Sequence, residues 1–245
     1  MNNNVPIISI ITVSYNTVKN IEQTILNVID QNFENYEFIV IDGGSTDGTL
    51  EVIKKYQDKI SYWISEPDKG IYDAMNKGII AASGVYVYFL NVGDEFYSKE
   101  TLNNIIKLSN DEDVIYGDTC MISDNKEVIL QSKSRDIDWR TMPYCHQSVI
   151  IKRELLRLNL FDISFKIAAD YKQYHELKKA KAVFRDIDEI ICRYDNNGFS
   201  AQNHSHLIKE YKKVSLMNTV GLLKKLKVSL FFLRCQFFHN VTRLS

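Results

Sequence analysis

Acidic and amide side chains cluster in three short segments, each of which follows a strongly apolar run. Asp42 begins the segment DGGSTDG, Asp68 and Lys69 lie in EPDKG, and Asn91 and Asp94 lie in NVGDE. Side chains of these types can accept hydrogen bonds from a base or ribose, and they can hold a hard divalent cation on a diphosphate. Taken singly, each is also typical of a turn or a helix cap.

The apolar runs before these segments have the pattern of buried strands, and stretches of helical periodicity separate them. Strands are expected at 7–13, 37–41, 62–65 and 85–90, and helices at about 21–29, 50–56 and 71–81. Alternation of strand and helix predicts an α/β fold, with a mainly parallel central sheet flanked by helices. Ligands bind beyond the carboxyl ends of such strands, so the three polar segments are expected to converge on one cleft.

The second half of the chain is more mixed. We expect strands at 114–117, 148–151 and 189–194, a hairpin over 121–129 turning at Asp124 and Asn125, helices near 152–158 and 169–179, and a turn at 196–198. No linker separates the two halves. The sequence therefore predicts one domain over residues 1–206 and a helical tail over 207–245.

Composition narrows the class of protein. The chain has 245 residues, 45% of them hydrophobic, with only 10 Gly and 3 Pro, which suits a single packed domain. The four cysteines (Cys120, Cys145, Cys192, Cys235) form no CxxC pair and are expected to be free thiols. The N-terminus has no secretory signal pattern, which predicts a cytoplasmic body. The part before the tail is acidic, which disfavours nucleic acid as a partner.

Four segments together resemble the inverting family 2 glycosyltransferases: ISIITVSYN, IVIDGGSTDGT, EPDKGIYDAMNKGIIAASG and YFLNVGDE. They are similar in particular to a bacterial surface-polysaccharide subgroup with EPDKGIYDAMNKG and LNxGD signatures. The resemblance covers roughly residues 5–202 and implies a GT-A fold. It implies that about 1–118 bind a nucleotide-sugar donor, with UDP as the expected nucleotide, and that 119–206 bind the acceptor. The implied reaction transfers a sugar to a hydroxyl of a polysaccharide or lipid-linked oligosaccharide, in capsule or lipopolysaccharide O-antigen assembly.

The resemblance implies roles for individual residues on the donor side. It places Asp42 against the nucleoside and Asp94 on a divalent metal, Mn²⁺ or Mg²⁺. Asn91 and Gly93 stand where the family often has Asp, so the metal motif is reduced. The other residues expected to contact or flank the donor are Tyr15, Asn16, Asp68, Lys69, Asn76 and Asn91.

Asp170, in the segment IAADY, resembles the acidic residue that acts as catalytic base in the family. Inverting transfer requires a carboxylate that removes the proton of the attacking hydroxyl, together with charge relief for the departing diphosphate. Without the resemblance, an acidic residue at the start of a helix would be interpreted as an N-terminal cap, which stabilises the helix dipole. His146 and Gln147 are expected near the acceptor or the diphosphate, and Ser200 in a loop that closes over the donor.

The tail is apolar and basic. Residues 222–238 read LLKKLKVSLFFLRCQFF, and after Glu210 the charged side chains are all basic: Lys212, Lys213, Lys224, Lys225, Lys227, Arg234 and Arg243. The run is too interrupted to cross a bilayer, and it predicts a basic amphipathic helix on an anionic membrane surface. The protein would then be peripheral on the inner face of a bacterial cytoplasmic membrane. Packing on the body or in a homodimer is the alternative.

Three other functions fit the sequence less well. A nucleotidyltransferase generally needs a glycine-rich phosphate loop after the first strand, but that position reads SYNTVKNIEQ. A dinucleotide-dependent oxidoreductase needs GxGxxG there, which is also missing. A non-catalytic nucleotide-sugar-binding scaffold of a polysaccharide-assembly complex is disfavoured because both Asp94 and Asp170 are present.

Overall fold

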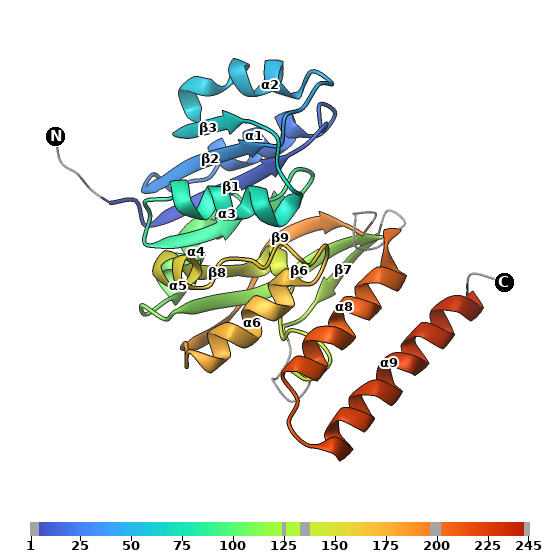
Figure 1. Ribbon diagram of the computed structural model, residues 1–245. Coiled ribbons are helices and arrows are strands. Elements are labelled where there is room, and N and C mark those ends of the chain that lie inside the picture. Colours follow the sequence, from blue (N-terminus) through green and yellow to red (C-terminus); the bar gives the residue numbers. More distant parts are fainter. Residues whose placement is uncertain (1–4, 124–125, 133–137, 197–201, 243–245) are drawn as a thin grey trace.

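The computed structural model describes residues 5–123, 126–132, 138–196 and 202–242 (Figure 1). Its strands are β1 (Ile8–Ser14), β2 (Tyr36–Asp42), β3 (Tyr62–Ser65), β4 (Tyr86–Phe89), β5 (Glu95–Phe96), β6 (Val114–Ser123), β7 (Lys126–Leu130), β8 (Val149–Lys152) and β9 (Phe184–Asp195). Its α-helices are α1 (Ile21–Ile29), α2 (Thr49–Lys55), α3 (Ile71–Ala81), α4 (Thr101–Leu108), α5 (Arg153–Leu158), α6 (Ala169–Lys179), α8 (His204–Met217) and α9 (Leu222–Thr242). Short 3₁₀ turns occur at Gln57–Lys59 and His146–Ser148.

The first four strands form the expected parallel sheet. Their order is β3-β2-β1-β4, and all three pairings are parallel. β1 and β2 are runs of β-branched residues buried on both faces, as a parallel sheet covered by helices requires. The carboxyl ends of β1, β2 and β3 therefore lie at one edge, where Ser14, Asp42 and Ser65 stand in register.

Beyond β4 the sheet is mixed rather than parallel. It continues β8-β6-β9-β5, with β8 antiparallel to both β4 and β6, β9 parallel to β6, and β5 antiparallel to β9. β7 pairs antiparallel with β6, which confirms the arms of the expected hairpin. Its turn at 124–125 lies outside the described residues, as do 197 and 198 of the turn expected at 196–198. The boundary expected between the donor-binding and acceptor-binding halves, at 118/119, falls inside β6, so one strand belongs to both halves.

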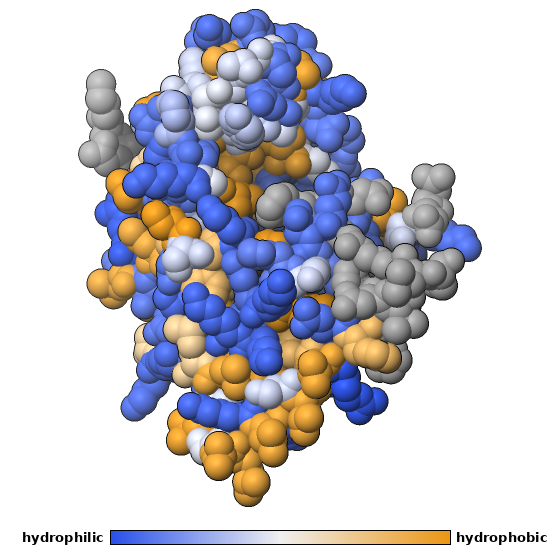
Figure 2. Space-filling view, turned by 45° about the vertical axis from the view of Figure 1, so that its right-hand side comes forward, coloured by the Kyte–Doolittle hydropathy of each residue, from blue (hydrophilic) through white to orange (hydrophobic). Residues whose placement is uncertain are grey.

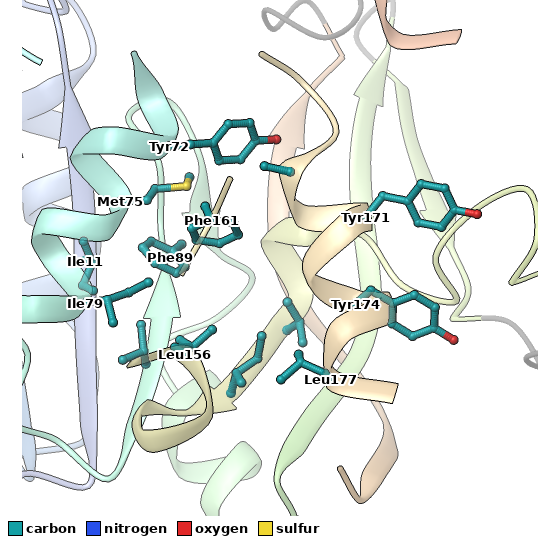
Figure 3. Packing of buried hydrophobic residues seen from close by; sticks show 14 of the residues in the cluster. Ile11, Tyr72, Met75, Ile79, Phe89, Leu156, Phe161, Tyr171, Tyr174 and Leu177 are labelled. Carbon is teal, nitrogen blue, oxygen red and sulfur yellow. The ribbon is translucent and has the colours of Figure 1, made fainter. Parts of the chain in front are cut away.

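Each face of the sheet carries its own hydrophobic core, because successive strand residues point to opposite faces. Ile11 and Val13 of β1 face the cluster formed with α3, α5 and α6, whereas Ile8 and Ile10 face the cluster with α1 and α4. Figure 3 shows part of the first cluster, with Tyr72 and Met75 of α3 directed toward α6. Tyr171 and Tyr174 extend from the opposite side of α6.

The two C-terminal helices lie outside this sandwich. α8 contacts α6 on one side and α9 on the other, and α9 runs alongside α8 at the periphery of the molecule (Figure 1). A small third cluster, with Ile208 of α8 and Val228 and Phe232 of α9 at its centre, joins the pair. In the described part of the chain, no helix is both long and apolar enough to span a membrane.

Candidate active site

The loops after β1, β2 and β3 meet at one edge of the sheet, which brings together two of the three polar segments that we expected to converge, 42–48 and 66–70. The Gly43 N–H donates to the Ser14 carbonyl at 2.9 Å, and the Glu66 N–H donates to the Asp42 carbonyl at 3.0 Å. Gly43 lies so close to its neighbours that an added Cβ would stand 2.4 Å from the Asp68 carboxylate and 3.3 Å from the Tyr15 ring. Tyr15, after β1, and Asp68, after β3, therefore lie on either side of Gly43, which has no side chain.

Asp42 is fully buried and is occupied by internal hydrogen bonds. Its Oδ1 accepts from the hydroxyls of Ser14 and Ser45, and its Oδ2 accepts from the Gly44 and Ser45 N–H groups and the Ser65 hydroxyl, over 2.6–3.0 Å. Burial opposes ionisation, but these hydrogen bonds outweigh it and hold the pKa of Asp42 below its ordinary value. These hydrogen bonds shape the 43–45 loop, and the direct nucleoside contact expected for Asp42 stays a prediction.

Tyr15 and Asn16, at the end of β1, border this loop from the solvent side. The Tyr15 side chain is 63% exposed, so one ring face is open to a stacking partner. Asn16 has a φ of 51°, a left-handed conformation that asparagine tolerates, and bonds the second loop twice. Its N–H donates to Ser45 Oγ at 2.7 Å, and its Oδ1 accepts from the Thr46 N–H at 2.9 Å.

The segment 66–70 lies opposite Tyr15. Asp68 caps the turn before α3 by accepting from the Gly70 N–H at 2.7 Å, and Lys69 is exposed beside it. Asn76 does something else: its amide bonds both main-chain groups of Phe161, donating at 2.8 Å and accepting at 2.9 Å. Asn76 therefore ties α3 to the segment after α5, and a contact with the donor stays a prediction.

Asp94 is a buried carboxylate in the loop after β4. It is 8% exposed, and burial raises its pKa to about 8, because no described residue offsets that cost with a hydrogen bond or a positive charge. In the same loop, Asn91 Oδ1 is buried without a described donor. A buried carboxylate beside an amide oxygen without a described donor suits a hard cation, which prefers oxygen ligands. Within the described part of the chain, no three His, Cys, Asp or Glu residues form a complete cage, so a metal here would need other oxygens as well.

Asp170 lies in the first turn of α6. Its Oδ1 accepts from the Tyr171 N–H at 2.7 Å, and the Tyr72 hydroxyl of α3 lies 3.4 Å from the same oxygen. Burial raises the pKa of Asp170 above its ordinary value. Figure 3 shows Tyr72 directed from α3 toward α6, with Phe161 and Phe89 nearby.

The segment 145–147 lies between the two carboxylates. The pKa of Cys145 is raised to about 11 by burial and also by the negative charges of Asp94 and Asp170. His146 stacks on Phe89 at 5.8 Å, its Nε2 is buried without a described partner, and burial lowers its pKa while the charge of Asp170 opposes that shift. Gln147 is half-buried and accepts the Tyr88 hydroxyl through its carbonyl at 2.7 Å.

Some residues of this region were not anticipated as site residues. They are Cys145, which the sequence predicts only to be a free thiol, and Tyr194 of β9, which interacts with both Cys145 and Asp94. Neither carries a sequence signal, because a cysteine or tyrosine in an apolar run is ordinary core. Ser200 lies outside the described residues. The site thus has a buried carboxylate, Asp94, suited to a cation, and a half-buried one, Asp170, suited to accepting a proton.

Solved structures share this architecture. The structure of S. aureus TarS residues 1–349 matches with a TM-score of 0.65 at 22% identity, over 92% of this chain and 70% of that one. A complex of that protein with UDP-GlcNAc gives 0.66 at 21% identity, over 92% and 71%. The mannosyltransferase PcManGT from Pyrobaculum calidifontis, in complex with GDP-Man and Mn²⁺, gives 0.67 at 19%, over 94% and 70%. The fold is that of the GT-A glycosyltransferases, α/β with a mixed sheet flanked by helices.

Sequence comparisons identify the family. The model of Glycosyl transferase family 2 matches residues 9–169. A PGL/p-HBAD biosynthesis glycosyltransferase of Mycobacterium bovis is 25% identical over 224 residues, 87% of this chain and 86% of that protein. An uncharacterized glycosyltransferase of Haemophilus influenzae is 30% identical over 168 residues, 64% and 67% of the two chains. The chain belongs to glycosyl transferase family 2.

Proposed function

We propose that the protein transfers one sugar, with inversion, from a nucleoside-diphosphate donor to an acceptor hydroxyl. The observation that carries this proposal is a pair of carboxylates, the buried Asp94 and the half-buried Asp170, whose charges both act on Cys145. Uridine diphosphate is the nucleotide we propose, and structural neighbours that bind UDP-GlcNAc or GDP-Man support a nucleotide-sugar donor.

In this proposal the donor lies along the edge formed by the loops after β1, β2 and β3. The base stacks on Tyr15, and the loop shaped by Asp42 and Asn16 follows the ribose. Asp68 and Lys69 border the ribose and phosphates from the other side, where the exposed Lys69 supplies a positive charge. Backbone held by buried hydrogen bonds orients the donor without reorganisation, which favours catalysis.

Asp170 is the proposed base. Its carboxylate removes the proton of the acceptor hydroxyl as that oxygen attacks the anomeric carbon, and the bond to the departing diphosphate breaks on the opposite side. Burial raises its pKa, so it is a stronger base than an exposed carboxylate. Asp94, with Asn91 beside it, would hold a divalent cation, Mn²⁺ or Mg²⁺. When bound, the cation supplies charge relief for the diphosphate.

His146 and Gln147 are proposed to face the acceptor or the diphosphate, since they lie between the two carboxylates. The acceptor class we propose is a polysaccharide or a lipid-linked oligosaccharide of a bacterial surface polymer. A lipid-linked acceptor requires the enzyme to work at a membrane, and the outer face of α9 suits that requirement.

The outer face of α9 is an apolar stripe with basic borders. Helical spacing puts six side chains on one side, each 53–84% exposed: Leu222, Leu223, Leu226, Leu230, Leu233 and Phe237. The opposite side, with Val228 and Phe232, is buried against α8. Lys225 stands at one border of the stripe and Lys227 and Arg234 at the other. Figure 2 shows hydrophobic side chains gathered along the lower edge of the molecule with hydrophilic ones beside them.

We propose that this stripe lies on an anionic bilayer, with the apolar side chains in the acyl boundary and the cations at the headgroups. Sedimentation with phosphatidylcholine vesicles, with and without phosphatidylglycerol, tests it. The double variant Leu226→Glu with Leu230→Glu is expected to lose at least about tenfold in vesicle affinity. Leu158→Glu, at a leucine 80% exposed on α5, is the matched control and should bind as wild type. Equal binding by both variants would contradict the proposal, as would a dimer that the double variant dissociates.

The donor proposal is tested by ligand stabilisation. UDP- and GDP-linked sugars are added to the full chain with and without Mn²⁺, and unfolding is followed on heating. A donor should raise the melting temperature, since a ligand that binds only the folded state stabilises it. Mn²⁺ should increase that shift in wild type and not in Asp94→Asn. No stabilisation by any nucleotide sugar would contradict the proposed function.

A further inference from the structure

Glu210, on α8, reaches into the segment that leads to Asp170. Its Oε1 accepts a hydrogen bond from the Lys166 N–H, and its Oε2 accepts from the N–H groups of Ile167 and Ala168, all at 2.9 Å. These three peptide groups immediately precede α6, whose second residue is Asp170. The Glu210 carboxylate of α8 thus fixes the backbone immediately before α6, the helix that carries Asp170.

The contact is buried and charged. Glu210 is 9% exposed, and although burial opposes ionisation, the three N–H groups and His206 hold its pKa below the ordinary value. His206, one turn earlier on α8, places its Nε2 3.0 Å from Oε1. Hydrogen bonds from backbone N–H groups to an ionised carboxylate are stronger than neutral ones.

The same segment is held from its other side by α3. The Tyr72 hydroxyl donates to the Ile167 carbonyl at 2.6 Å, so both main-chain groups of Ile167 are fixed, one by each helix. The hydroxyl has one proton, and the short bond to Ile167 uses it, so its 3.4 Å approach to Asp170 is only a contact. Figure 3 shows Tyr72 extending toward the start of α6.

We propose that Glu210 is a positioning residue for Asp170. The start of α6 sets where the Asp170 side chain points, and three oriented peptide groups fix that start. A small displacement of a catalytic group is costly, because proton transfer requires hydrogen-bond distance to the attacking hydroxyl. The inference rests on the proposed function, in which Asp170 is the base. It adds a residue of α8, beyond the stretch that matches the family model, to the requirements of the reaction.

Glu210→Ala and Glu210→Gln test the proposal, with Glu176→Gln as the matched control. Glu176 forms a surface ion pair with Lys179 on α6 itself, far less buried than Glu210. Glutamine keeps one acceptor oxygen for Ile167 and Ala168, so it should retain part of what alanine loses. We expect kcat to fall about 10- to 100-fold in Glu210→Ala and less in Glu210→Gln, as misplacement of a reacting group does. The control should match wild type.

Two readouts separate positioning from loss of structure. The donor dissociation constant should stay within about twofold of wild type, because the hydrogen bonds of Glu210 are to residues 166–168 and His206. A damaged fold would weaken donor binding as well as kcat. The acid limb of the kcat profile should move to lower pH in Glu210→Ala, because a displaced Asp170 is more hydrated and has a lower pKa. If Glu210→Ala does not fold, Glu210→Gln decides.

The result that would overturn the inference is a folded Glu210 variant with wild-type kcat and pH profile, in an assay where wild type turns over and Asp170→Asn does not. That result would leave the proposed function intact. A wild-type protein without transfer to any acceptor tested would instead overturn the proposed function, and this inference with it.

Discussion

Replacing Asp42 should separate a structural carboxylate from a nucleotide ligand. The side chain is fully buried and accepts from two backbone N–H groups and three serine hydroxyls. In Asp42→Ala the hydroxyls can rotate to other acceptors, but the N–H groups of Gly44 and Ser45 cannot. Two unsatisfied buried donors cost about 2–6 kcal/mol together. That is a large part of the roughly 5–15 kcal/mol by which domains are stable.

Asp42→Asn should be much milder. The amide oxygen can take the place of Oδ2 and accept both N–H groups, while the amide nitrogen donates to the hydroxyl oxygens of Ser14 and Ser45. The variant then loses only the charge assistance, about 1–2 kcal/mol. Urea unfolding at neutral pH measures both values from the midpoint and slope. Asp58→Ala, at an exposed aspartate of the Gln57–Lys59 turn, serves as the surface control.

Nucleotide binding by Asp42→Asn completes the test. Because the carboxylate is fully buried, the folded asparagine variant should bind the nucleotide within a few-fold of wild type. An alanine variant as stable as wild type would refute the hydrogen-bond reasoning. A stable asparagine variant with nucleotide affinity reduced more than about tenfold would refute the structural role, because that loss is the size expected for a direct contact.

Two further predictions concern stability. Gly117→Ala should destabilise the fold by about 1–3 kcal/mol, because an added Cβ would stand 2.3 Å from the Glu189 carbonyl oxygen. Gly117 lies at the irregularity between β6 and β9, and urea unfolding measures the loss of stability. The pKa of His175 is lowered to about 4, first by burial, so folded protein binds its proton less readily than unfolded chain, whose histidine titrates near 6.5. Its stability contribution is therefore complete above about pH 6.5 and is lost as pH falls toward 4; between pH 6.5 and 5 wild type should lose about 2 kcal/mol more than His175→Gln. Equal slopes for the two proteins would contradict that assignment.

The N-terminal half of the fold follows from sequence periodicity. Runs such as 7–13 and 37–41 are buried on both faces and alternate with amphipathic helices, so their parallel pairing was predictable. The direction of β8 was not. The run 148–151 has the pattern of a strand in either orientation, and the pattern does not show that it inserts between β4 and β6, antiparallel to both.

The site was predictable where its residues form local motifs, and not where distant segments meet. The convergence of the loops bearing Asp42 and Asp68 follows from strand-end geometry. The five donors around Asp42 come from three separate segments, so its burial has no signal in the sequence. Glu210 reads as one charge in a polar helix, and its contact with residues 166–168 depends on how α8 packs against α6.

The variant Asp170→Asn tests most directly whether Asp170 is the catalytic base. Asparagine preserves the shape of the side chain and can still accept from the Tyr171 N–H, so the fold and the donor dissociation constant should stay as in wild type. Removal of a general base is expected to lower kcat by about 10²- to 10⁴-fold. Single-turnover transfer from a UDP-sugar, measured beside donor binding, gives both quantities. A variant that binds the donor normally and transfers the sugar at the wild-type rate would contradict the assignment.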